Sequence, residues 1–327
     1  MTNSTDLANS VAQPTTDPVL VIGADGTVAR ATLAALVRRG AHVRALVRRP
    51  RTEPDPMPAV EWVIGDLREP GTLRGALTGV RTVLYVTPHA DGEVALAEHV
   101  VDECRRAEAR LVFVGVHVSG RTLSGRLLRT VFRVLLPAYG PKLSIGALVE
   151  TTSPEAVLLV PSNFYDNDLT FLPDILAGSF PTPLRRVNRV AASDIGEIAA
   201  TALTDPAFPA GTQGISGPVS LTGAESAAAW AAVLGRPVRY AGDDREAWEE
   251  ALCRRIPEGK KRRDWRSSFR ALGWMSMGTS AREVAETAQL LGRAPLAYRD
   301  WVEVQVARQA QRAGTAAGNG GIGAPHC

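Results

Sequence analysis

The sequence predicts an α/β protein with a Rossmann-type, doubly wound parallel sheet and a smaller, partly helical C-terminal lobe on the substrate side. In the first half of the chain, short and continuously apolar runs alternate with stretches of helical periodicity. Strands of that kind are buried on both faces, as in a parallel sheet that carries helices on both sides. The first apolar run also ends in a glycine-rich turn that opens a helix.

The expected elements follow one another in a regular order up to residue 161. Strands are predicted at 18–23, 41–47, 60–65, 82–87, 110–116 and 156–161. Helices are predicted at 27–40, 71–79, 92–108, 119–140 and 143–152. Later elements are shorter and less regular, with strands at 185–190 and 237–240 and helices at 193–204, 223–234, 280–291 and 296–311.

These elements divide the chain into four parts. We place a dinucleotide-binding Rossmann domain at 18–161 and a substrate-side lobe, interleaved with the sheet, at 162–311. Residues 1–17 are polar and lack periodicity, and residues 312–327 are rich in Gly and Ala. Such segments bury too little apolar surface to fold, so we expect a disordered leader and a disordered tail.

Composition excludes several classes of protein. Lys and Arg number 37 against 34 Asp and Glu, and a net charge of +3 is too small to indicate nucleic-acid binding. The N-terminus does not resemble a signal peptide, and no apolar run reaches the ~20 residues of a membrane span. Three cysteines without a CxxC pair argue against a disulfide scaffold or a metal site. We therefore expect a soluble, cytoplasmic protein without nucleic-acid, membrane or metal partners; a homo-oligomer remains open.

The turn after the first strand has the pattern of a dinucleotide-binding site. Residues 23–29 read GADGTVA, which is GxxGxxA between a predicted strand and a predicted helix. The first glycine allows the tight turn, the second allows close approach of a pyrophosphate, and the helix N-terminus attracts its charge. The predicted cofactor-binding residues of this turn are Gly23, Asp25, Gly26, Thr27 and Val28.

The end of the second strand favours NADP(H) over NAD(H). NAD-binding sites place an acid there for the ribose 2′-hydroxyl, whereas this chain has Arg48 and Arg49. A guanidinium matches the 2′-phosphate of NADP as a bidentate donor, although a solvated basic loop is the alternative. Asp66 follows the third strand, where it could accept a hydrogen bond from adenine, cap the next helix, or do both.

Together these motifs resemble the NmrA-like branch of the atypical short-chain dehydrogenase/reductases. The resemblance spans about 18–245 and rests on GADGTVA (23–29), VRALVRRP (43–50), GDL (65–67), VTP (86–88), VPSNFYDND (160–168), VAASDIGEIAATAL (190–203), GPVSLTG (217–223) and LGRPVRY (234–240). It implies that Leu67, Thr87 and Pro88 also contact the cofactor. It further implies a cleft between the two lobes, with either a reductase acting on quinones, azo dyes or phenylpropanoid double bonds or a non-catalytic NADP sensor.

The catalytic residues are less clear. Short-chain dehydrogenases carry Tyr-x-x-x-Lys, but here Tyr139 lies only three residues before Lys142, and Pro141 disturbs the helical geometry between them. Lys142 at a helix start, eight residues before Glu150, is similar to the catalytic lysine of isoflavone-reductase-like relatives. It is therefore our first candidate for proton transfer or carbonyl polarisation, with an exposed structural lysine as the alternative.

Further candidates lie at the carboxyl edge of the predicted sheet, where ligands bind in such folds. His117, with a pKa near neutrality, is a possible acid or base, and Tyr139 remains a second one, although a lone histidine there is more often structural. The predicted substrate-binding residues are Ser119, Asn163, Phe164 and Tyr165, of which the two aromatic ones could equally be core residues.

Three functions remain open at this point. The first is an NADP(H)-dependent reductase of a carbonyl, quinone or conjugated double bond in an aromatic small molecule. The abundance of Arg, Ala and Gly indicates a GC-rich bacterial genome, which favours tailoring of a secondary metabolite, as in antibiotic biosynthesis, including reductive coupling. The alternatives are a non-catalytic NADP-binding regulator and a redox-neutral isomerase or cyclase that retains its cofactor.

Overall fold

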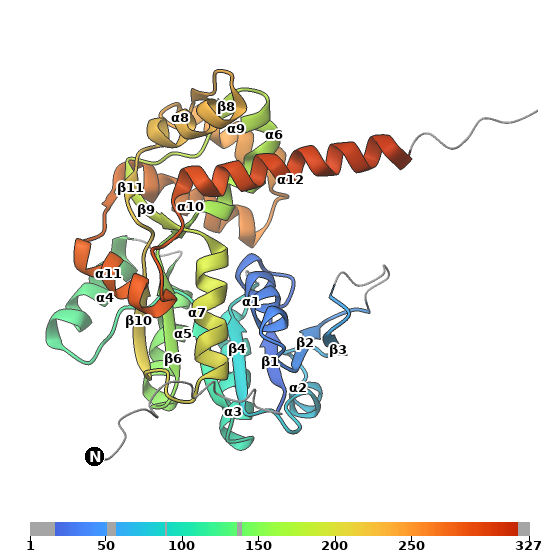
Figure 1. Ribbon diagram of the computed structural model, residues 1–327. Coiled ribbons are helices and arrows are strands. Elements are labelled where there is room, and N and C mark those ends of the chain that lie inside the picture. Colours follow the sequence, from blue (N-terminus) through green and yellow to red (C-terminus); the bar gives the residue numbers. More distant parts are fainter. Residues whose placement is uncertain (1–16, 51–56, 89, 136–138, 320–327) are drawn as a thin grey trace, which may run out of the picture.

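A computed structural model describes residues 17–50, 57–88, 90–135 and 139–319. A helix-covered sheet forms the lower body in Figure 1, and a mostly helical lobe lies above it. The long helix α12 (Tyr298–Asn319) runs across this lobe and extends beyond the body.

Seven parallel strands form the main sheet, in the order β10-β6-β5-β4-β1-β2-β3. Their bounds are β1 (Val19–Ile22), β2 (Val43–Val47), β3 (Val60–Ile64), β4 (Thr82–Val86), β5 (Arg110–Val114), β6 (Val157–Pro161) and β10 (Gly211–Ile215). The chain moves outward from β1 in one direction to β3 and then returns to β4 on the other side. This reversal between β1 and β4 is where doubly wound sheets open a ligand crevice, and it confirms the predicted fold class.

Two apolar cores cover the two faces of this sheet. Alternate residues of β1 face opposite cores, with Val19 and Val21 in one and Leu20 and Ile22 in the other. One face is covered by α1 (Thr27–Arg38) and α7 (Ala192–Thr204), which pack against each other. The other face is covered by α2 (Pro70–Ala76), α3 (Glu93–Arg106) and α5 (Gly140–Thr152). The carboxyl ends of the central strands are thus held rigidly between helices.

The C-terminal lobe has an aromatic core of its own. Trp230, Tyr298 and Trp301 are almost fully buried there, and Arg189 is buried beside Asp168, with which it forms an ion pair of 2.7 Å. Its helical elements are η2 (Tyr165–Phe171), α6 (Leu172–Leu176), α8 (Gly223–Leu234), α9 (Arg245–Arg255) and α10 (Lys260–Trp274), besides α12. Its short strands are β7 (Asn163–Phe164), β8 (Ser179–Phe180), β9 (Arg186–Val190), β11 (Ser220–Leu221), β12 (Arg239–Tyr240) and β13 (Ser276–Met277).

Two helices lie outside these layers. Helix α11 (Ala281–Leu291) packs beside β10 and α7, which brings a late part of the chain back to the sheet. Helix α4 (Leu123–Leu135) follows β5 and contacts α5 at the margin of the body (Figure 1). Among the described residues, no helix is long and apolar enough to cross a membrane.

Some expected boundaries differ from the structure. The tail expected to be disordered from residue 312 is helical up to Asn319, because its alanines extend α12. Residues 320–327 and residues 1–16 of the expected leader lie outside the described part, whereas Asp17 forms an ion pair with Arg81. Several elements were not predicted, namely strands β7, β8, β10, β11 and β13 and the helical elements η2, α6, α9 and α10.

Candidate functional site

The turn between β1 and α1 forms a backbone cradle at the β1–β4 crevice. Gly23 has a φ of +84°, and a Cβ added to it would lie 3.0 Å from the Val86 carbonyl oxygen at the end of β4. The Gly26 amide donates a hydrogen bond to the Gly23 carbonyl at 2.8 Å, which closes the turn. A side chain at position 23 would therefore be strained and would press on the end of β4, so this turn requires glycine.

The start of α1 is suited to an anionic group. Gly26 is its N-cap residue, no side chain caps the helix, and its first turn contains no acidic residue. The amides of Thr27, Val28 and Ala29 therefore lack intrahelical acceptors and carry the positive end of the helix dipole. Asp25 lies just outside the helix, with its carboxylate 3.7 Å from the guanidinium of Arg30. The cradle accordingly fits a pyrophosphate.

The ends of β2 and β3 provide the groups expected around the adenosine. Arg48 and Arg49 are exposed directly after β2, and neither has an ion pair or hydrogen bond within the described part of the chain. The Asp66 carboxylate accepts a hydrogen bond from the Arg68 amide at 2.9 Å, while α2 begins after Glu69. Asp66 thus stabilises the turn and does not cap the helix. Arg48 and Arg49 fit the 2′-phosphate of NADP(H) better than the unphosphorylated ribose of NAD(H).

The other cofactor contacts implied by the resemblance lie where that role requires. Leu67 is half-buried against the apolar core under β3, and Thr87 and Pro88 are half-buried directly after β4. The end of β4 also borders the Gly23 turn, through the carbonyl of Val86. These positions are consistent with cofactor contacts, which stay predictions.

Lys142 lies in a buried cluster of charges at the start of α5. Its Nζ is 3.4 Å from Oε2 of Glu93, the first residue of α3, and its side chain is only 12% exposed. The other carboxylate oxygen of Glu93 is 3.2 Å from Nζ of Lys260, which donates a hydrogen bond to Asp264 at 2.8 Å. Burial acts to lower the pKa of Lys260, but the hydrogen bonds and negative charges of Asp264 and Glu93 raise it overall. Glu93 thus forms ion pairs with Lys142 of the Rossmann domain and Lys260 of the C-terminal lobe.

Tyr139 is not coupled to Lys142. Its hydroxyl forms a hydrogen bond of 2.7 Å with Ser268 of α10, in the C-terminal lobe. Burial raises the pKa of Tyr139, and the hydrogen bond to Ser268 only partly opposes this effect. Tyr139 therefore retains its proton and lacks the lysine-assisted activation of a Tyr-x-x-x-Lys pair.

His117 and Ser119 meet at Glu150 in a second polar cluster. The Ser119 hydroxyl and the Gly120 amide both donate hydrogen bonds to the Glu150 carboxylate, which is also 3.5 Å from Nε2 of His117. Burial acts to raise the pKa of Glu150, but these donors and the charge of His117 lower it overall.

The environment of His117 favours a structural role. Its side chain is fully buried, and burial lowers the pKa of His117 despite the nearby charge of Glu150. A Cβ on Gly146 of α5 would lie 2.8 Å from its Nδ1, which shows how closely the ring packs. The structural alternative for His117 is thus favoured, and Glu150 anchors the loop after β5 through Ser119.

The predicted substrate-binding residues after β6 divide into two groups. Asn163 and Phe164 are half-buried in β7, which pairs with β9 between the two lobes. Tyr165 is fully buried, with its ring edge-on to that of Tyr298 at 4.9 Å. Tyr165 is therefore a core residue, which is the alternative that the sequence left open for it.

Three residues of this site were not predicted from the sequence, namely Glu93, Lys260 and Ser268. The spacing of Lys260, Asp264 and Ser268 places them on one helical face, which is the signal that was available. The segment 241–275 carried no recognisable motif, and nothing in it indicated which part of the sheet it covers. In the structure, helix α10 of this segment adds charged and polar groups beside Lys142 and Tyr139.

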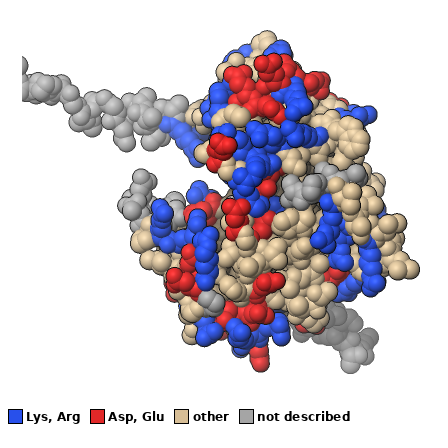
Figure 2. All heavy atoms as spheres, turned by 180° about the vertical axis from the view of Figure 1, so that it is seen from behind, with Lys and Arg blue, Asp and Glu red and all other residues tan. Residues whose placement is uncertain are grey.

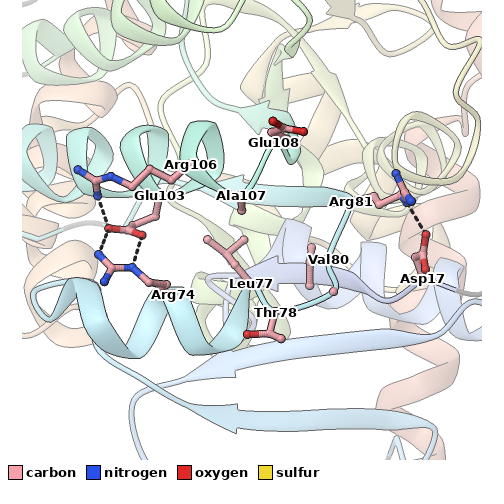
Figure 3. A pocket seen from close by; sticks show the side chains of 11 residues that line it. Asp17, Arg74, Leu77, Thr78, Val80, Arg81, Glu103, Arg106, Ala107 and Glu108 are labelled. Carbon is pink, nitrogen blue, oxygen red and sulfur yellow. Dashed lines mark hydrogen bonds and ion pairs between the residues drawn. The ribbon is translucent and has the colours of Figure 1, made fainter.

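A pocket of about 510 Å³ lies at the opposite, amino-terminal edge of the sheet, where Leu77 and Val80 form part of its wall (Figure 3). Its Glu103 is buried and accepts hydrogen bonds from Arg74 and Arg106. The hydrogen bond from Arg74, opposed by burial, lowers the pKa of Glu103. The three arginines and three carboxylates that line this pocket balance in charge, and it lies away from the carboxyl ends of the strands, so we do not assign it to the cofactor or substrate.

A family model described as the NmrA-like family matches residues 15–288. The chain belongs to the NmrA-like family. Among curated relatives, the NAD(P)H azoreductase of Xenophilus azovorans is 30% identical over 251 residues, which cover 72% of this chain and 80% of that one. The (4-alkanoyl-5-oxo-2,5-dihydrofuran-3-yl)methyl phosphate reductase of Streptomyces griseus is 26% identical over 289 residues, covering 86% and 96%.

Several solved structures share the fold. The triphenylmethane reductase of Citrobacter sp., complexed with NADP(H), matches with a TM-score of 0.69 and 17% identity, covering 88% of this chain and 99% of that one. The negative transcriptional regulator NmrA, in complex with NADP, matches with a TM-score of 0.67 and 15% identity, covering 88% and 94%. At such identities these matches describe the architecture only.

Proposed function

We propose that this NmrA-like protein is an NADP(H)-dependent reductase of aromatic or conjugated small molecules. The observation that carries the proposal is the glycine cradle at the β1–β4 crevice, with Arg48 and Arg49 next to it on the adenosine side. The azoreductase and the dihydrofuranyl phosphate reductase among its relatives support a reductive role. A carbonyl, quinone or conjugated double bond is the expected acceptor. Tailoring of a secondary metabolite, including reductive coupling, is the biological role that we favour.

The protein's own residues then have distinct tasks. When bound, NADPH supplies a hydride from its nicotinamide ring. The Gly23–Gly26 turn and the first amides of α1 hold the pyrophosphate, and Arg48 with Arg49 holds the 2′-phosphate. Because Glu93 fixes its ammonium group, Lys142 can stabilise negative charge that develops on the acceptor or donate the proton that the reduced acceptor takes up. We do not assign proton transfer to Tyr139, because its hydroxyl is hydrogen-bonded to Ser268. We do not assign it to His117 either, because that side chain is buried.

The experiment that tests this function is turnover by purified protein. NADPH oxidation is followed by absorbance with azo dyes, quinones and aromatic ketones, and NADPH binding is measured by fluorescence. Lys142→Met should lower kcat about a hundredfold or more, as loss of a preorganised electrostatic group does, with little change in NADPH affinity. Lys261→Met is the matched control, because Lys261 is an exposed lysine of α10.

Each other outcome has a defined meaning. Unchanged kcat in Lys142→Met would remove Lys142 from the mechanism but leave the reductase in place. Tight NADPH binding without turnover of any acceptor would favour a regulator, which the engagement of Tyr139 by Ser268 already makes the second candidate. Conversion of a substrate without net NADPH consumption would indicate an isomerase or cyclase.

A further inference from the structure

Helix α4 presents an apolar stripe that the described part of the protein leaves uncovered. The exposed fractions are 83% for Leu123, 67% for Leu127, 40% for Val131 and 74% for Val134. At 100° per residue, these four positions fall within about 80° of one another around the helix axis. Large apolar side chains rarely form a contiguous exposed patch on a protein surface, and such a patch indicates an interaction surface.

The same helix is basic. Arg126, Arg129 and Arg133 lie on the flank of the stripe, and none of them pairs with an acid within the residues that the structure describes. The sequence contains no Asp or Glu between Glu108 and Glu150. Figure 2 shows basic side chains next to uncharged ones at the right-hand edge of the molecule, which is the side of α4.

We propose that α4 docks this protein on an anionic lipid bilayer, lying in the plane of the interface with its stripe among the acyl chains. An amphipathic helix with an apolar face and arginines on its polar face is the form that binds such interfaces. At 1.5 Å per residue α4 is about 20 Å long, which suits a helix that lies on a membrane and does not cross it. The proposal replaces the expectation that no membrane is a partner.

A second copy of the chain suits this surface less well. In a two-fold symmetric dimer the same patch meets itself, so the unpaired arginines of the two copies would be brought together. A bilayer that contains acidic lipids offers an apolar interior for the stripe and negative headgroups for the arginines. Charge complementarity therefore selects the membrane.

Docking would also orient the proposed active site. Ser119, four residues before α4, is bonded to Glu150 of α5, the helix that also carries Lys142. The carboxyl edge of the sheet would thus lie near the lipid surface, where apolar acceptors accumulate. This consequence rests on the proposed reductase function, whereas docking itself does not.

The test is flotation of the full-length protein with vesicles of phosphatidylcholine alone or mixed with phosphatidylglycerol, at low and high salt. We expect binding to the mixed vesicles only, weakened by salt. Leu127→Asp should weaken it tenfold or more, and Arg133→Ser about fivefold, the effect of one arginine near an anionic surface. Val304→Asp, at an exposed valine of α12, should leave binding unchanged.

All three variants change exposed side chains, and thermal melting shows whether they fold. Absence of binding to the mixed vesicles, or equal binding by Leu127→Asp, would overturn the proposal. A dimer that Leu127→Asp dissolves, without vesicle binding by the parent protein, would overturn it in favour of a second copy. Since flotation requires no turnover, its failure is distinguishable from failure of the reductase proposal.

Discussion

Replacing Gly23 by alanine tests the cofactor cradle through two effects that the structure separates. The first is backbone strain, because a residue with a side chain at a φ of +84° costs roughly 1–2 kcal/mol. The second is steric, because the new Cβ would lie 3.0 Å from the Val86 carbonyl oxygen, and relieving such overpacking costs about 1–3 kcal/mol. Together they predict a loss of roughly 2–5 kcal/mol in the free energy of unfolding.

The loss of NADPH affinity should exceed what strain alone causes. Because Gly23 and Gly26 close one turn, relief of the contact with Val86 displaces the amides that face the pyrophosphate. We expect at least a tenfold weaker affinity, equal to about 1.4 kcal/mol, in a fluorescence titration. Gly40→Ala is the matched control, since Gly40 has a φ of +68° and no atom within 4 Å of the added Cβ. It should show the strain alone, about 1–2 kcal/mol in urea unfolding, with unchanged affinity.

The reasoning about the cradle would be refuted by one pattern of results. If Gly23→Ala lost no more stability than Gly40→Ala and bound NADPH as tightly as the parent protein, the turn would not contact the cofactor. A loss of affinity equal in both variants would indicate a general effect of destabilisation.

Two further predictions concern single charged groups. Arg48→Ala should weaken NADPH binding about tenfold or more and leave NADH binding unchanged, since only NADPH carries the 2′-phosphate; equal losses for both would contradict the assignment. For His117, the folded-state pKa lies below the ordinary value of 6.5, so the unfolded chain takes up the proton first. The stability that neutral His117 contributes is full above pH 6.5 and is lost as pH falls toward the folded pKa. Urea unfolding between neutral and mildly acidic pH should show this slope in the parent protein and in His42→Gln, an exposed control, but a weaker one in His117→Gln. The depressed pKa of Glu150 adds a similar loss below pH 4.5.

The cofactor half of the site was predictable because its information is local in the sequence. Gly23 and Gly26 follow an apolar strand and precede a helix, and that order dictates a turn with open backbone amides. Arg48 follows β2 directly, so the register of a parallel sheet brings it to the same edge. Six of the seven strands of the sheet were expected for the same reason. The exception, β10, reads GTQGI and lies at the edge of the sheet, with weak burial and no apolar run.

The half of the site to which we assign catalysis could not be predicted, because its contacts join distant segments of the chain. Glu93 meets Lys260 across 167 positions, and Tyr139 meets Ser268 across 129. A sequence pattern shows which residues share a helical face but not which other helix that face contacts. Tyr165 illustrates the reverse case, since its position after β6 suggests a ligand contact while the turn into η2 directs its ring into the aromatic core.

The start of α5 explains why a short-chain dehydrogenase pair is replaced here by a connection between the lobes. Tyr139 is the N-cap residue of α5 and Lys142 lies in its first turn, but their side chains have different partners. Lys142 reaches Glu93, which also holds Lys260, while Tyr139 reaches the same helix α10 through Ser268. Helix α10 thus contacts the sheet domain through Glu93 and Tyr139, which both lie beside the proposed reaction centre. Any movement of the C-terminal lobe away from the sheet would free the Tyr139 hydroxyl and leave Glu93 paired with Lys142 alone. The position of the lobe and the electrostatics of Lys142 are therefore linked.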